Sequence, residues 1–83
     1  MKKLSDLPNI GKVAEAKLIE AGIESSEELV KIGSKEAFLR IRLNDPTACL
    51  HMLYGIEGAV EGVKDKFLSD DVKEDLKTFF KSL

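Results

Sequence analysis

The sequence of 83 residues has no tryptophan and one cysteine, and its longest uninterrupted apolar run is three residues. A single cysteine rules out a disulfide framework within the chain. No segment approaches the roughly 20 apolar residues that a membrane-spanning helix needs. No secretory signal core follows Met1-Lys2-Lys3 either. We therefore expect a cytoplasmic protein that does not contact a membrane.

An excess of positive charge is also missing. The chain has 13 basic and 15 acidic residues, giving a net charge of −2. The charge is uneven, because residues 1–23 carry four lysines against three acids and residues 31–44 carry four basic residues against one acid. Any nucleic-acid contact must therefore be local, weak and sensitive to salt.

What is present indicates an all-helical fold. Hydrophobic residues make up 43% of the chain and charged residues 34%, a balance typical of a folded domain. β-Branched residues are few and do not alternate with polar ones, which argues against strands. No linker or repeat interrupts the chain. We predict one domain over residues 1–83, an all-α orthogonal bundle of five or six helices.

Helix boundaries follow from capping signals. A short helix over residues 3–7 should end at Pro8, and a second helix should run to about Ala21, with Gly22 as its C-terminal cap. Two further helices are expected over residues 25–33 and 34–43; the second of these is apolar on two sides, which suggests neighbours on both. Asp45 and Pro46 predict the start of the longest helix, whose apolar stripe reaches Val63 and includes Cys49. The last helix should begin at Ser69.

The segment with the clearest functional signal is Pro8-Asn9-Ile10-Gly11, which resembles the hairpin of helix-hairpin-helix (SAM-like) elements in DNA-handling proteins. In that motif the glycine lets the backbone approach a phosphate, and the amides that open the second helix point outward. Such contacts position a protein on the nucleic-acid backbone without reading its sequence. The predicted nucleic-acid-binding residues are Asn9, Ile10, Gly11, Lys12, Val13 and Lys17.

Asn9 stands where this hairpin usually has glycine. Asparagine adopts a left-handed backbone more readily than most residues, so the turn can form, but the side chain is a potential obstacle to a phosphate. The alternative interpretation is that the hairpin only packs two helices or contacts a protein. Both interpretations stay open at the level of sequence.

Four stretches together resemble the C-terminal domain of the TfoX/Sxy family of competence regulators: residues 4–11, residues 33–40, residues 49–54 with 57–59, and residues 76–80. Asparagine at position 9 is usual in that family. The resemblance implies a compact helical domain associated with regulation of natural competence, and it brings no catalytic residues. Larger members carry an additional N-terminal domain, so this chain is either a stand-alone relative or part of a longer protein.

Other residue groups give weaker signals. Lys35 and Arg42 share one helix side as a secondary basic patch. A row of three glycines suggests the close approach of another backbone, either within the chain, from the first or last helix, or across a homodimer seam: Gly55, Gly58 and Gly62. Cys49 and His51 point apart on a helix and cannot share a metal. We expect no enzyme activity, cofactor, metal or small-molecule substrate, and a partner that is DNA, a regulatory protein or a second copy.

Overall fold

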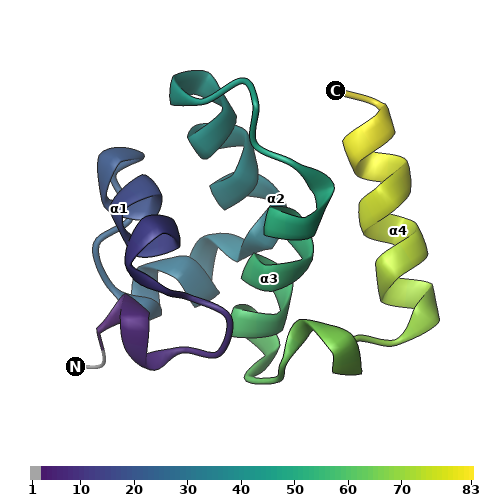
Figure 1. The fold of residues 1–83 in the computed structure, drawn as a ribbon, viewed down its shortest axis with the longest axis horizontal. Helices are drawn as coiled ribbons and strands as arrows, with labels where there is room; N and C mark the ends of the chain where they lie inside the picture. The colour runs from purple at the N-terminus through teal and green to yellow at the C-terminus, as the bar shows by residue number, and fades with distance from the viewer. Residues whose placement is uncertain (1–2) are drawn as a thin grey trace.

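The chain folds into helices joined by short turns (Figure 1). The computed structural model describes residues 3–83, which contain no β-strand. The elements in chain order are two 3-10 helices and four α-helices: η1 (Leu4–Asp6), α1 (Lys12–Glu20), α2 (Ser26–Asn44), α3 (Leu50–Glu61), η2 (Asp65–Phe67) and α4 (Asp70–Lys81). The all-α prediction is confirmed, whereas the expected number of five or six helices is not.

The difference in number arises mainly in α2, which joins the two helices expected over residues 25–43. Gly33 interrupts it with a non-helical backbone (φ 83°, ψ 167°), so the two halves meet at a kink. The hydroxyl of buried Ser34 donates a hydrogen bond to Glu57 Oε1 of α3 (2.5 Å) directly after this kink. A hydrogen bond with Glu57 in turn raises the pKa of the Glu61 carboxyl. A polar contact therefore ties the kink of α2 to α3.

The start of α3 lies later than predicted. Asp45 does not cap a helix, because its Oδ1 accepts hydrogen bonds from the backbone N–H and the hydroxyl of Thr47 (3.1 and 2.5 Å). This Asx-type arrangement forms a turn instead. The helix begins at Leu50 with Cys49 as its N-cap residue, and Cys49 is exposed. The predictions of a helix start at Asp45 and of a buried Cys49 were therefore wrong.

Three other boundaries follow the predicted capping chemistry. Gly22 adopts φ 88° directly after Ala21, the C-cap residue of α1. The Ser25 hydroxyl accepts a hydrogen bond from the Glu28 amide at the start of α2 (3.2 Å). The Ser69 hydroxyl accepts one from the Val72 amide at the start of α4 (3.2 Å). The two serine signals are local, because the hydroxyl that accepts and the amide that donates are three residues apart.

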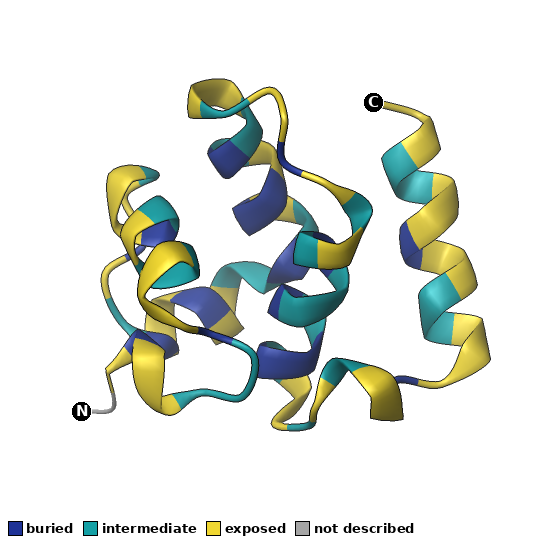
Figure 2. Ribbon diagram, in the orientation of Figure 1, coloured by how far each residue is buried: buried dark blue, intermediate teal, exposed yellow. Residues whose placement is uncertain are grey.

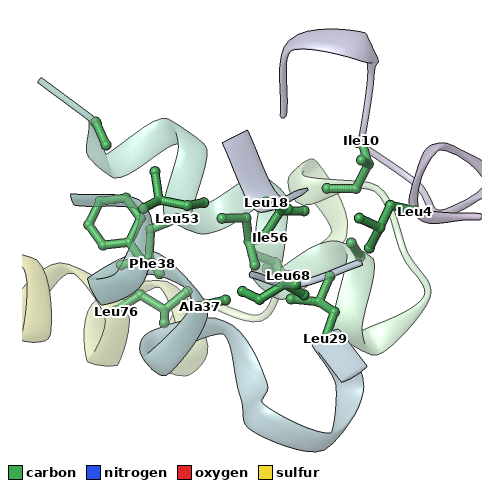
Figure 3. Close-up of a cluster of buried hydrophobic side chains, with 14 residues drawn as sticks. Leu4, Ile10, Leu18, Leu29, Ala37, Phe38, Leu53, Ile56, Leu68 and Leu76 are labelled. Carbon is green, nitrogen blue, oxygen red and sulfur yellow. The ribbon is translucent and has the colours of Figure 1, made fainter. Parts of the chain in front are cut away.

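The hydrophobic core lies where α2 and α3 cross, and α1 and α4 contribute one buried residue each (Figure 2). In Figure 3, Leu4 and Ile10 lie at one end of the cluster and Phe38 and Leu76 at the other. The second apolar side of α2 is not covered, since Leu43 is 85% exposed and Leu39 is 37% exposed. The expectation of neighbours on both sides was therefore wrong. The core holds the turn before α1 beside α3, and this contact builds the candidate site.

Candidate binding site at the hairpin turn

The hairpin turn, residues 8–11, connects η1 to α1 and is tied to α3 by one side chain. Asn9 is the non-glycine residue with positive φ (67°) among the described residues. Its Nδ2 donates to the carbonyls of Gly55 (3.2 Å) and Val63 (3.0 Å), and its Oδ1 accepts from the Asp65 amide (3.2 Å). The side chain therefore points into the protein, and it is not the obstacle to a phosphate that the sequence suggested.

One glycine of α3, Gly58, makes room for this side chain. A Cβ at Gly58 would lie 2.5 Å from Asn9 Nδ2 and 2.7 Å from the Val63 carbonyl, whereas a Cβ at Gly55 would meet Asn9 at an ordinary 3.5 Å. Gly62 has a different role, because it ends α3 in a left-handed conformation (φ 79°) with open space around it. The close approach that the glycine row predicted therefore comes from the hairpin turn of the same chain, and not from the first or last helix.

Gly11 forms an exposed corner at the start of α1. It is the N-cap residue, and no side chain caps the helix there. The backbone N–H groups of residues 11–14 have no hydrogen-bond partner in the part of the chain that the structure describes. A Cβ at Gly11 would meet nothing within 4 Å. These unpaired amides lie at the positive end of the helix dipole, so they can donate to an anionic or carbonyl group.

A groove of about 560 Å³ lies between this corner and α3. We call it the hairpin groove, and the residues that line it come from the hairpin turn, the start of α1, α3 and η2: Asn9, Ile10, Gly11, Lys12, Val13, Ala14, Cys49, His51, Met52, Gly55, Ile56 and Asp65. Val13 is 70% exposed. The His51 side chain is largely exposed, with Nε2 3.7 Å from Asp65 Oδ2. The lining of the hairpin groove is mainly apolar, and Lys12 and Asp65 place charges of opposite sign at its rim.

Lys17 lies apart from this groove. Its Nζ forms an ion pair with Asp45 Oδ2 (2.5 Å), in a separate cavity of about 150 Å³ that Glu20 and Ile41 also line. The hydrogen bond from Lys17, followed by that from Thr47, lowers the pKa of Asp45 to about 2. Five of the six predicted residues are thus brought together, and the charge of Lys17 is engaged elsewhere.

The secondary basic patch also has intramolecular partners. Lys35 Nζ forms an ion pair with Asp75 Oδ2 (2.7 Å) and lies 5.5 Å from the centre of the Phe79 ring. The Arg42 guanidinium lies 5.6 Å from the centre of the Phe80 ring. Both residues therefore hold α4 against α2, and the structure gives them a packing role.

The sequence did not identify the α3 side of the hairpin groove. Cys49 was predicted on a buried apolar stripe, Cys49 and His51 were dismissed as a metal pair, and Gly55 was noted only for the close approach of a backbone. Asp65 carried no local signal, because its link to Asn9 spans 56 residues. In residues 3–83 no helix is long and apolar enough to cross a membrane, and no group of three or more His, Cys, Asp and Glu residues could hold a metal ion.

Comparison with known proteins gives one family and close structural likenesses. The family model of the TfoX C-terminal domain matches residues 1–80. Protein Sxy of Escherichia coli (strain K12) is 32% identical over 82 residues, which cover 99% of this chain and 39% of Sxy, so the chain spans about two fifths of that relative. A crystal structure of an uncharacterized protein from Listeria monocytogenes, in a triclinic form, is 52% identical with a TM-score of 0.96 and covers 98% of this chain and 92% of its own. A protein of unknown function from the same organism, in a tetragonal form, is 53% identical with a TM-score of 0.93 and covers 95% of this chain and 96% of its own.

Proposed function

Because the chain belongs to the TfoX C-terminal domain family, we propose that it is a non-enzymatic, cytoplasmic regulatory domain of the kind that controls natural competence. We propose further that its hairpin turn is a helix-hairpin-helix element that contacts the backbone of nucleic acid. Sxy supports the first part through 32% identity to this chain. The second part depends on the geometry at Gly11.

The observation that carries the proposal is the set of unpaired amides at an open corner. Residues 11–14 offer N–H groups at a helix N-terminus, and a Cβ at Gly11 would meet no neighbouring atom of residues 3–83 within 4 Å. Asn9 turns its side chain inward, so the approach to Gly11 is clear. A phosphate oxygen is a suitable acceptor for such amides, and Lys12, exposed at the same place, adds a positive charge.

The charges around the corner set the expected strength of binding. Lys17 is engaged by Asp45, and Asp65 places a carboxylate on the rim of the hairpin groove. Few phosphates can therefore be neutralised, and log K should fall with log salt with a slope of only about −1 to −2. Binding should be weak and independent of sequence, since backbone contacts position without specifying.

A second candidate is contact with a regulatory protein, and the apolar lining of the hairpin groove favours it. Val13 is exposed although it is apolar, and Met52 and Ile56 continue the apolar surface into the groove. An apolar side chain of a partner would bury this surface, whereas a phosphate would not. A Val13→Glu substitution should abolish such a contact while leaving the amides at Gly11 in place.

Fluorescence anisotropy with a labelled DNA duplex at low salt tests the first candidate. Lys12→Glu should abolish binding, because it reverses the charge beside the open amides. Lys77→Glu on α4 is the matched control and should leave most of the affinity, since Lys77 does not line the groove. Equal affinity of the Lys12→Glu and wild-type proteins, or no binding by the wild type at low salt, would reject nucleic-acid contact and leave the protein partner.

A further inference from the structure

We propose that Asn9 is the positioning residue of the hairpin groove. Its carboxamide connects the hairpin turn to the junction of α3 and η2, and so fixes the corner at Gly11 relative to the opposite wall. This inference rests on the proposed function for its binding readout, but its structural readouts do not depend on any ligand.

The first support is the complete use of the Asn9 side chain. Both described donor contacts go to carbonyls, of Gly55 and Val63, and the oxygen accepts from Asp65. These partners lie 46, 54 and 56 residues away in sequence, and all three contacts are partly buried. The two carbonyls require two donors from this side chain, and the Asp65 amide requires an acceptor. Only a carboxamide supplies both in a side chain of this size.

The second support is the shape of the surface that receives this side chain. The missing Cβ of Gly58 leaves the space that Asn9 Nδ2 occupies, since a methyl group there would lie at 2.5 Å. A glycine in the middle of a helix costs about 1 kcal/mol relative to alanine. The contact with Asn9 explains why a glycine stands at position 58 in spite of this loss of helix propensity.

The third support is the connection to the other wall of the groove. Asp65 donates its amide to Asn9, while its carboxylate lies 3.7 Å from His51 Nε2. Asn9, His51 and Asp65 all line the groove. One side chain therefore contacts the hairpin side and the α3–η2 side at once, and its loss should loosen the groove.

Two substitutions test the role of the amide. Asn9→Gly keeps the positive φ without strain but removes all three contacts. NMR order parameters of residues 9–11 should fall from values near 0.85 to below about 0.6. Hydrogen exchange at the Asp65 amide should accelerate at least about tenfold, since that group loses its acceptor. Affinity for the DNA duplex should fall about tenfold with an unchanged salt slope, because no charge is removed.

Asn9→Asp is nearly isosteric and keeps the acceptor for Asp65, but a carboxylate would face the carbonyls of Gly55 and Val63 without a proton to donate. It should loosen the turn more than Asn9→Gly at neutral pH. Protonation restores a donor, so order at residues 9–11 should recover as the pH falls below the pKa of the introduced carboxyl. A steric or propensity effect would give no such pH dependence.

Ser69→Ala is the control for a general loss of stability. It removes the cap of α4, which does not line the groove, and should leave residues 9–11 and the duplex affinity unchanged. A rigid turn in Asn9→Gly, or an Asn9→Asp protein without the acid recovery, would overturn the positioning role. A loosened turn together with a wild type that does not bind DNA would uphold Asn9 and reject only the nucleic-acid function.

Discussion

The hairpin turn is held against α3, and α4 is held against α2 and α3, by different chemistry. The hairpin turn depends on the side-chain amide of Asn9. Its partners are backbone groups of Gly55 in α3, of Val63 directly after that helix, and of Asp65 in η2. Helix α4 contributes one fully buried side chain, Leu76, and adds ring contacts such as Phe80 on Phe38, with centres 5.9 Å apart. In Figure 1 the two regions lie on opposite sides of α3.

The same difference separates the basic residues of the two regions. Next to α4, Lys35 and Arg42 are engaged by aromatic rings and a carboxylate. Beside the hairpin turn, Lys12 is exposed, and no ion pair is found for it among the described residues. Lys35 and Arg42 therefore take part in packing α4, whereas Lys12 is free to contact a ligand at the exposed corner.

The largest effect is expected from Leu76→Ala. The side chain is 2% exposed and is the buried contact of α4, so its truncation should lower the free energy of unfolding by about 2–5 kcal/mol. Urea denaturation followed by circular dichroism measures it. Lys77→Ala at the next, exposed position should stay within about 0.5 kcal/mol. A small loss for Leu76→Ala would mean that α4 is held mainly by its rings.

A pair of glycine substitutions in α3 should separate the steric fit against the hairpin turn from the gain in helix propensity. Gly58→Ala puts a methyl group against Asn9 and the Val63 carbonyl and should lower the free energy of unfolding by about 1–3 kcal/mol. Gly55→Ala meets only an ordinary contact and should be neutral or stabilising by up to about 1 kcal/mol. Thermal unfolding of both variants gives the comparison; equal effects would show that the tight fit at Gly58 is unimportant.

Lys35→Met and Lys12→Met should differ in stability and in binding. Lys35 is partly exposed, so loss of its ion pair and ring contact should cost only about 0.5–1 kcal/mol. Lys12→Met should leave stability unchanged and weaken the duplex complex. Chemical denaturation and anisotropy on the same samples test both. A stabilising role for Lys12 would remove the contrast between the two regions.

The smallest effect concerns the ion pair of Lys17 with Asp45. The pKa of Asp45 is lowered to about 2, against about 3.9 for an unperturbed aspartate. A lowered folded pKa gives stability that is present above the unfolded value and lost as the pH falls toward 2. The stability difference between wild type and Asp45→Asn should therefore shrink between pH 4 and 2. Thermal melts across that range measure it, and a constant difference would argue against the pair.

Local signals in the sequence were sufficient for much of the fold. Gly22, Ser25 and Ser69 were placed correctly because each acts on groups within a few residues. Asp45 misled because two other groups use its carboxylate: Thr47, two residues on, holds Oδ1 in a turn, and Lys17, 28 residues away, pairs with Oδ2. A cap signal cannot reveal that its carboxylate has a distant partner.

The candidate site was predicted only on its hairpin side. Gly11, Lys12 and Val13 follow from the motif, and the structure brings them together. The α3 side could not be predicted, because Asn9 recognises backbone carbonyls, which any sequence provides. The row of glycines indicated a close approach, and only the structure shows that an amide side chain fills it.

The exposed thiol of Cys49 makes the hairpin groove accessible to simple chemistry. It is the one cysteine in the sequence and it lines the groove on the side of α3. A small alkylating reagent can therefore narrow this groove in the wild-type protein without an engineered attachment point. An environment-sensitive dye at the same sulfur would report occupancy directly, whatever the partner turns out to be.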